Sequence, residues 1–304
     1  MKTMNVALSD GERVNHGTPQ GRCRRLFYEF FSNKLACAGT AIILVLALIA
    51  IFAPKIAPQD PYKLTDSYDA GPSAQHFLGT DSLGRDIFSR LIYASRISLI
   101  VGIGTMLIST FLGTLLGLLS GFLGGKVDMV IMRTADVFMT FPPMIILLVL
   151  VGIIGPGLWK IIFVLGILGW TSLARVVRGC VLSVKEKNYI KASRLMGIST
   201  ARIVTSHVLP NVAGPVFLSA TSMTVYGILS EASLSFLGLG VQPPVASWGN
   251  MLTEAQSLTV LTSMPWVWVP PSVLILICVF SFNSIGDGLR DALAGERTSS
   301  TTTD

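Results

Sequence analysis

Residues 35–53 form an apolar run without a single charged side chain. A helix of this length matches the thickness of the hydrocarbon core of a bilayer. The run leads into Pro54 and Lys55 rather than into the small residues of a signal-peptide cleavage site. It therefore predicts a retained membrane-spanning helix. Composition agrees, because 51% of the residues are hydrophobic and only 13% are charged, about half the charged share of a soluble domain.

Five more apolar stretches follow, at about 97–123, 130–154, 158–177, 212–237 and 267–285. With the first run they predict an all-α membrane protein with six transmembrane helices. Of the 23 Lys and Arg residues, 17 lie in segments that would share a side of the membrane with residues 1–34. The positive-inside rule then places both termini in the cytoplasm.

This topology divides the chain into parts with different surroundings. The predicted parts are a cytoplasmic tail (1–34), the first transmembrane helix (35–53), an extracytoplasmic loop (54–96), a transmembrane core (97–286) with a cytoplasmic loop at 181–210, and a second cytoplasmic tail (287–304).

Two local patterns predict how helices are placed. Gly113, Gly117 and Gly121 recur every four residues in the second span, so a neighbouring helix can approach that face closely. In residues 85–96, apolar and charged side chains fall largely on opposite helical faces. That separation is typical of a helix lying in the membrane interface.

The loop at 181–210 holds a short amphipathic segment. Four of its residues recur at the spacing of one helical face: Tyr189, Ala192, Ser193 and Met196. Gly197 is expected to break this helix, Ser199 or Thr200 can cap a second one, and Pro210 should limit that second helix. Periodicity alone leaves two interpretations, a ridge presented to a partner protein or a connector packed on the membrane surface.

The same loop resembles a cytoplasmic motif of ABC importer permeases, in which Glu-Ala-Ala is followed by Gly and then by Ile-x-Leu-Pro. Four positions match this pattern: Ala192, Gly197, Leu209 and Pro210. Three positions depart from it: Lys191, Ser193 and His207. The missing glutamate weakens the case for a specific ion pair at the motif's first position.

Longer segments resemble the second, or C-type, permease subunits of dipeptide, oligopeptide and nickel importers. Because four such segments occur in the expected order, the resemblance is specific, and it extends over nearly the whole chain. The segments are FLGTDSLGRDIFSRLIYASRISL (77–99), MRTADVFMTFP (132–142), EASLSFLGLGVQPPVASWGNML (231–252) and FNSIGDGLRDAL (282–293).

The resemblance implies a type I ABC importer permease bundle in a bacterial inner membrane. Its partners would be a homologous second permease, two ATP-binding subunits and an extracytoplasmic solute-binding protein. The solute would be a di- or oligopeptide, with nickel, another metal chelate or a glutathione-like solute as alternatives. The helix near 186–196 would couple to an ATPase subunit through these residues: Tyr189, Lys191, Ala192, Ser193, Met196, Gly197, Leu209 and Pro210.

The chain lacks a GxxxxGK[ST] phosphate loop. ATP and magnesium are therefore expected on the partner subunits, and neither catalytic residues nor a cofactor are expected in this chain. His76 and His207 have no second ligand at metal-binding spacing, so no metal site is expected. Nucleic-acid binding is not expected either, because the net charge of +6 comes with no reader motif.

Asp136 and Glu231 lie within apolar runs, where a charge requires a partner, water or a cavity. Asp136 can pair with Arg133 or with a neighbouring span, and Glu231 can form a helix-end or inter-helix hydrogen bond, or both can line a translocation path. Three residues of the outer loops are candidates for docking the binding protein, unless these loops only pack on each other: Asp81, Arg85 and Trp248.

Two other classes of membrane protein would show different sequence patterns. An ATP-independent secondary transporter would be expected to show an internal repeat with paired broken helices. A membrane-embedded enzyme would require a cluster of nucleophilic or metal-binding residues within the bundle. The sequence shows neither pattern.

Overall fold

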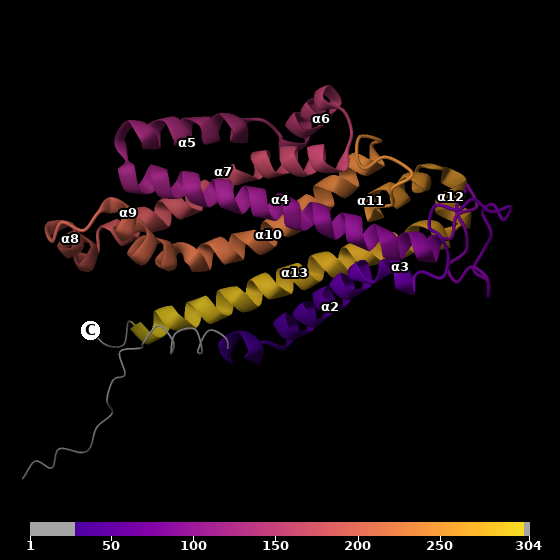
Figure 1. The fold of residues 1–304 in the computed structure, drawn as a ribbon, viewed down its shortest axis with the longest axis horizontal. Coiled ribbons are helices and arrows are strands. Elements are labelled where there is room, and N and C mark those ends of the chain that lie inside the picture. Colours follow the sequence, from indigo (N-terminus) through magenta and orange to yellow (C-terminus); the bar gives the residue numbers. More distant parts are fainter. Residues whose placement is uncertain (1–27, 301–304) are drawn as a thin grey trace, which may run out of the picture.

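The computed structural model describes residues 28–300, with side chains described as far as residue 293. Within this part the secondary structure is helical apart from one isolated bridge between Thr80 and Asp86. The helices form an elongated bundle in which α2 and α13 run along one side, α4, α7 and α10 form the middle, and α5 and α6 lie on the other side (Figure 1). Residues 1–27 and 301–304, parts of the two expected tails, lie outside the described residues.

Helix α2 (Lys34–Ile51) is the predicted first span, and it packs against α13 (Pro265–Ser300). The Asn33 side chain caps α2 by accepting hydrogen bonds from two backbone N–H groups, and its amide donates to Asp291 over 3.1 Å. A Cβ atom added at Gly39 would lie 2.7 Å from the carbonyl oxygen of Ser281. The two helices are therefore in backbone contact. A short helix, α3 (Ala53–Ile56), follows α2.

The middle of the bundle consists of α4 (Ile87–Leu123), α7 (Leu158–Lys185) and α10 (Leu209–Phe236). The glycine face predicted on the second span is confirmed, because all three glycines meet α7. A Cβ atom at Gly117 would lie 2.7 Å from both the Ala174 carbonyl oxygen and the Val177 Cβ atom. Only hydrogen atoms at these positions let the two backbones come so close.

The predicted interfacial helix is wrong. Residues 87–96 are the first turns of α4, which begins at Ile87 with Asp86 as its N-cap. Arg85 and Arg90 are only 8% and 4% exposed, so the first part of the face that was assigned to solvent is covered, while Arg96 is exposed. Helical periodicity showed which residues share this face. It could not show that a second loop packs on it.

The third span is broken rather than continuous. Helix α5 (Gly125–Thr140) and helix α6 (Pro143–Ile154) meet at an angle of 91°. Phe141 is extended, as a residue before proline prefers to be, and Pro142 has no N–H group to continue the helix. By length and apolarity the described residues contain five helices that could cross a membrane, or six with this bent pair as one span.

At one end of the bundle lie α8 (Asn188–Leu195), α9 (Thr200–Ile203) and the π-helix η1 (Val204–Val208). Ser199 occupies the N-cap position of α9 but its side chain makes no capping hydrogen bond. Pro210 does not end this helix, since the helix continues from Thr200 to Phe236. The wider π turn before Pro210 accommodates a residue that would clash with the preceding turn of a regular α-helix.

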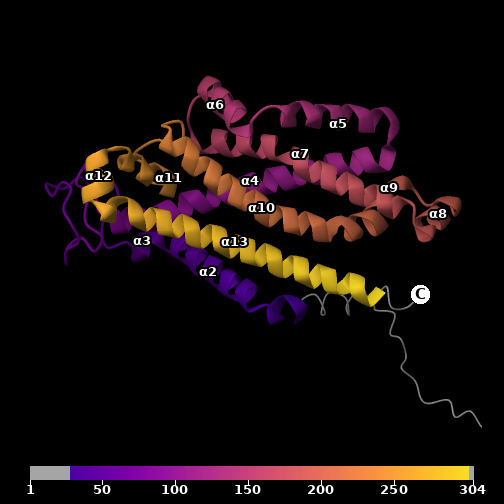
Figure 2. The same cartoon turned by 180° about the vertical axis from the view of Figure 1, so that it is seen from behind.

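The opposite end holds the 57–86 loop with α11 (Trp248–Met251), η2 (Leu252–Gln256) and α12 (Leu258–Ser263). Helix α2 begins, and α13 ends, toward the side of the bundle that carries α8 and α9 (Figures 1 and 2). Both described ends of the chain therefore point toward the same end of the molecule. The last residues of α13 fall in the region expected to be a tail.

Candidate functional sites

The exposed tip of the α8 end is apolar. Leu195 is 90% exposed and Met196 70%, whereas Ile190 is fully buried. Ser193, which was predicted to lie on the exposed ridge, is 6% exposed and donates to the Tyr189 carbonyl over 2.8 Å. The predicted ridge is therefore wrong at Ser193, while Tyr189, Ala192 and Met196 are exposed.

Leu195 is the most exposed of these side chains and was not predicted. The i, i+3, i+4, i+7 pattern does not include Leu195. Its only signal in the sequence is that it is an apolar residue in a loop rich in Lys and Arg. Together Leu195 and Met196 provide an apolar contact surface at the tip of the helix.

Gly197 ends α8 in a Schellman motif. Its N–H donates to the Arg194 carbonyl over 3.0 Å, and the N–H of Ile198 donates to the Ser193 carbonyl over 3.2 Å. Gly197 has a φ of +74°, in the region that side chains disfavour. An added Cβ atom would meet nothing within 4 Å. The requirement for glycine is therefore conformational and not a matter of space.

Helix α8 is attached to the start of α10 by a small polar cluster. The Tyr189 and His207 rings lie 6.2 Å apart, and the Asn211 amide donates to the His207 carbonyl over 2.6 Å and to the Tyr189 hydroxyl over 3.3 Å. Leu209 and Pro210 lie between these contacts as the first residues of α10. His207, which departs from the family motif, is thus a packing partner of the short helix.

A second attachment joins α8 to the end of α4. The Arg194 guanidinium lies 4.9 Å from the centre of the Phe122 ring, a cation–π distance. Lys185, at the end of α7, donates to the Phe122 carbonyl over 2.9 Å. Contacts with α4 and α10, and the short connection from the end of α7, hold α8 against the bundle.

An acid and a base also pair at the start of α8, where Glu186 follows the end of α7. Lys191 Nζ lies 2.9 Å from Glu186 Oε2, and the hydrogen bond from Lys191 lowers the pKa of the Glu186 carboxyl. The pair is exposed to solvent, so its contribution to stability is small.

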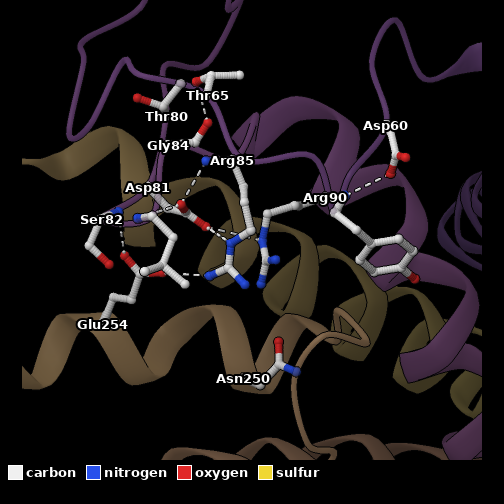
Figure 3. A network of polar contacts seen from close by, with 12 residues as sticks. Asp60, Thr65, Thr80, Asp81, Ser82, Gly84, Arg85, Arg90, Asn250 and Glu254 are labelled. Atoms are coloured by element: carbon white, nitrogen blue, oxygen red, sulfur yellow. Dashed lines mark hydrogen bonds and ion pairs between the residues drawn. The ribbon is translucent and has the colours of Figure 1, made fainter.

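At the other end of the bundle, three buried charged residues and the half-buried Glu254 form a network (Figure 3). Asp81 accepts from Arg85 Nε over 2.7 Å and lies 3.4 Å from Arg90 Nε. Glu254 joins the network at 3.6 Å from Arg85 and accepts from the Ser82 N–H over 3.3 Å. Burial and the nearby Asp81 raise the pKa of Glu254.

This network overturns the predicted docking residues. Asp81 and Trp248 are 2% and 0% exposed, and Arg85 is engaged by both acids of the network. The backbone N–H of Trp248 donates to Ser98 Oγ on α4 over 3.0 Å. The alternative, that the two outer loops pack on each other, describes Asp81 and Arg85, whose network includes Glu254, whereas Trp248 packs against α4.

The two acids in apolar runs have different surroundings. Glu231 is completely buried and accepts from the Ser235 and Ser247 hydroxyls, over 2.6 and 2.7 Å. It therefore joins α10 to the start of α11 and does not face an open path in this chain. Asp136 is 49% exposed and lies 2.8 Å from Arg175 and 3.8 Å from Arg133. The sequence indicated Arg133 or a neighbouring span, and both occur, with Arg175 of α7 as the partner from that span.

A further pair between the same helices was not predicted. Arg178 Nε and a terminal nitrogen of Arg178 donate to the two carboxylate oxygens of Asp128 over 2.5 and 2.6 Å, and Ser120 also donates to Asp128. This bidentate arrangement ties α5 to α7. No group of three or more potential metal-binding side chains occurs among the described residues.

Comparison with known proteins assigns the fold to a family. Residues 113–297 match the family described as "binding-protein-dependent transport system inner membrane component". Residues 22–76 match the N-terminal transmembrane domain of oligopeptide transport permease C. The chain therefore belongs to the binding-protein-dependent transport system inner membrane components, the type I permease subunits of ABC importers.

Several curated relatives match over most of their length. The oligopeptide transport system permease protein OppC of Bacillus subtilis is 42% identical, over 87% of this chain and 86% of its own. The dipeptide transport system permease protein DppC of the same organism is 40% identical, over 86% and 82%. The glutathione transport system permease protein GsiD of Pectobacterium atrosepticum is 40% identical, over 89% and 90%.

Proposed function

We propose that this chain and a homologous second permease together form the path through which an ATP-driven importer carries di- or oligopeptides. The observation that carries this proposal is the chain-long similarity to permeases named for oligopeptide and dipeptide transport. Glutathione is the second candidate solute, because a permease named for glutathione is 40% identical to this chain, compared with 42% and 40% for the oligopeptide and dipeptide permeases, over a similar length. Nickel has no comparable support among these relatives.

The α8 end is the proposed contact with an ATP-binding subunit. Its apolar tip at Leu195 and Met196 is exposed, and the attachments of α8 to α4, α7 and α10 would transmit a displacement to the spans. ATP and magnesium would be held by two partner subunits. Closure of those subunits would move α8 and shift the bundle between its two accessible states.

In this proposal the α8 end lies in the cytoplasm and the α11–α12 end lies outside a bacterial inner membrane, facing a solute-binding protein. The uneven distribution of Lys and Arg supports this orientation. Exposed apolar side chains of the outer loops, in place of the buried residues, are the proposed docking contacts: Leu64, Tyr68, Phe77 and Leu258.

The test is uptake by the complete complex in proteoliposomes, with its binding protein outside and ATP inside. Radiolabelled di- and tripeptides, glutathione and a nickel chelate are compared at equal concentration. We expect ATP-dependent accumulation of the peptides. Accumulation of glutathione alone would favour the second candidate, and accumulation without ATP or partner subunits would contradict an ABC importer.

A further inference from the structure

The bend between α5 and α6 leaves backbone carbonyls without the donors that a continuous helix would supply. Pro142 and Pro143 have no N–H group, so the carbonyls of Phe138 and Met139 lose their partners four residues on. The Ile145 N–H donates to the Pro142 carbonyl over 3.0 Å and therefore does not continue the α5 ladder. The bend is also open, because both prolines are exposed.

Packing against α7 fixes the level of this bend along the span. On the α5 side, Phe138 packs against the buried cluster that contains Trp170 of α7. On the α6 side, Leu147 belongs to the same buried cluster as Leu165 of α7. The bend therefore lies beside the segment of α7 between Leu165 and Trp170.

That segment is the apolar middle of the span. Helix α7 has no charged residue between Lys160 and Arg175, and residues 165–170 lie at the centre of this stretch. Hydrocarbon offers no hydrogen-bond donors, so unpaired backbone carbonyls at such a depth are tolerated only where protein covers them or where they line a water-filled cavity. The bend requires one of these two neighbours.

The surroundings of the bend are unsuited to water. An open groove of about 380 Å³ follows the bend, and all of its lining side chains are apolar, among them Val137, Phe141, Ile145 and Val149. Apolar cavities of this kind stay dry. A lipid acyl chain could fill the groove, but it has no donor for the carbonyls. A protein side chain with a polar neighbour satisfies both.

The chain itself leaves the groove uncovered. Phe141, Ile145 and Val149 are 54%, 56% and 55% exposed. Helices α5 and α6 lie on the side of the bundle away from α2 and α13 in both views (Figures 1 and 2). Among the proposed partners, the ATP-binding subunits lie in the cytoplasm and the binding protein lies outside the membrane. Only the second permease shares the depth of the bend.

We propose that the groove at the α5–α6 bend receives a membrane helix of the second permease. The proposal rests on the proposed function, because that function requires such a subunit. The inserted side chain is apolar, and a hydroxyl or amide group beside it on the same helix donates to a carbonyl of the bend. The contact ends at Leu150, so Gly152 and the rest of α6 lie outside it.

The test is photo-crosslinking within the complete complex in native membranes. The photoreactive amino acid p-benzoylphenylalanine replaces Phe141, which lines the groove, and we expect a covalent adduct with the second permease. The same amino acid in place of Phe280 is the control. Phe280 is 69% exposed on α13, across the bundle from the groove, and should give no adduct with that subunit.

A second measurement fills the groove. Ile145→Trp should lower the amount of second permease recovered with this chain by roughly tenfold, because overpacking weakens the contact. The yield of the chain in the membrane should stay normal. Leu276→Trp is the matched control, since Leu276 is 55% exposed on α13, and it should leave the recovery unchanged.

Adducts of the photoreactive group at position 141 with lipid alone, or with a labelled peptide, would overturn the proposal, because the groove would then face the bilayer or the translocation path. Equal adducts from positions 141 and 280 would overturn it as well, and so would full recovery of the second permease with Ile145→Trp. If Ile145→Trp lowers the yield of the chain itself, the crosslink decides. A wild-type chain that co-purifies with no second permease would instead refute the proposed function.

Discussion

Lys191 Nζ on α8 lies 2.9 Å from Oε2 of Glu186, the residue that follows α7, so an acid–base pair lies at the start of α8 although the motif glutamate is missing. Lys191→Glu would place two carboxylates side by side at an exposed site, where charge interactions are weak. We expect peptide-stimulated ATPase activity to fall by no more than about twofold. The double variant Glu186→Lys/Lys191→Glu restores the pair and should restore activity. A failure of the double variant to recover would mean that Lys191 contacts a partner directly.

Gly197→Val should be much more damaging. A β-branched residue at a φ of +74° is strained, so the Schellman turn would rearrange and displace the tip at Leu195 and Met196. We expect a normal yield in the membrane but a loss of roughly tenfold or more in stimulated ATPase activity and uptake. Gly197→Asn is the control, because asparagine tolerates this conformation. Full activity in Gly197→Val would show that α8 is not the coupling element.

The contact between α4 and α7 can be tested at Gly117. A leucine there would collide with the Ala174 carbonyl and with Val177, and overpacking of this kind costs about 1–3 kcal/mol or more. We expect a lower melting temperature and less assembled complex in detergent. Gly152→Leu adds the same side chain to α6, where an added Cβ atom meets nothing within 4 Å, and should assemble normally. Equal behaviour of the two variants would contradict the packing argument.

The network at the α11–α12 end predicts a large loss of stability when Asp81 is neutralised and a small one when Glu254 is neutralised. Asp81→Asn leaves Arg85 and Arg90 buried without their shared carboxylate, a change that costs about 3–5 kcal/mol. Glu254→Gln should be better tolerated, because Glu254 lies 3.6 Å from Arg85 and the glutamine side chain can still accept from the Ser82 N–H. Thermal unfolding of the purified complex distinguishes the two. Similar losses of stability would mean that Glu254 is as necessary as Asp81.

The pKa of Glu254 also gives a pH dependence. Its raised value in the folded protein means that the folded state holds the proton more tightly than the unfolded state. Its contribution to stability therefore increases as pH falls from neutral through the raised pKa toward the ordinary value. Glu254→Gln should remove this increase from the wild-type melting curves. An unchanged pH profile in the variant would assign the effect to another group.

Topology is tested with single cysteines in a background without the four natural ones. Ser73→Cys and Ser257→Cys are exposed at the α11–α12 end and should react with an impermeant maleimide on intact cells. Ser199→Cys is exposed at the α8 end and should react only after permeabilisation. Ser247 is fully buried, so Ser247→Cys serves as an unreactive control. Labelling of Ser199→Cys on intact cells would reverse the orientation.

The sequence by itself determined the class of protein and much of its local geometry. Apolar length indicated six spans, because a bilayer of fixed thickness requires a minimum length of helix. The four-residue spacing of Gly113, Gly117 and Gly121 indicated a close helix contact, because that spacing places them on one face. Gly197 was recognisable as the end of α8. These features depend on residues near one another in the chain.

Only the tertiary structure decided which of the predicted faces are covered. Arg85 and Trp248 were expected at the surface, but each is buried by a segment more than a hundred residues away along the chain. Asp136 pairs with Arg175, which lies 39 residues away. The 91° bend between α5 and α6 likewise depends on packing, because prolines permit a break without fixing its angle. Periodicity determines which residues share a helical face, and the partner of that face is set by the rest of the fold.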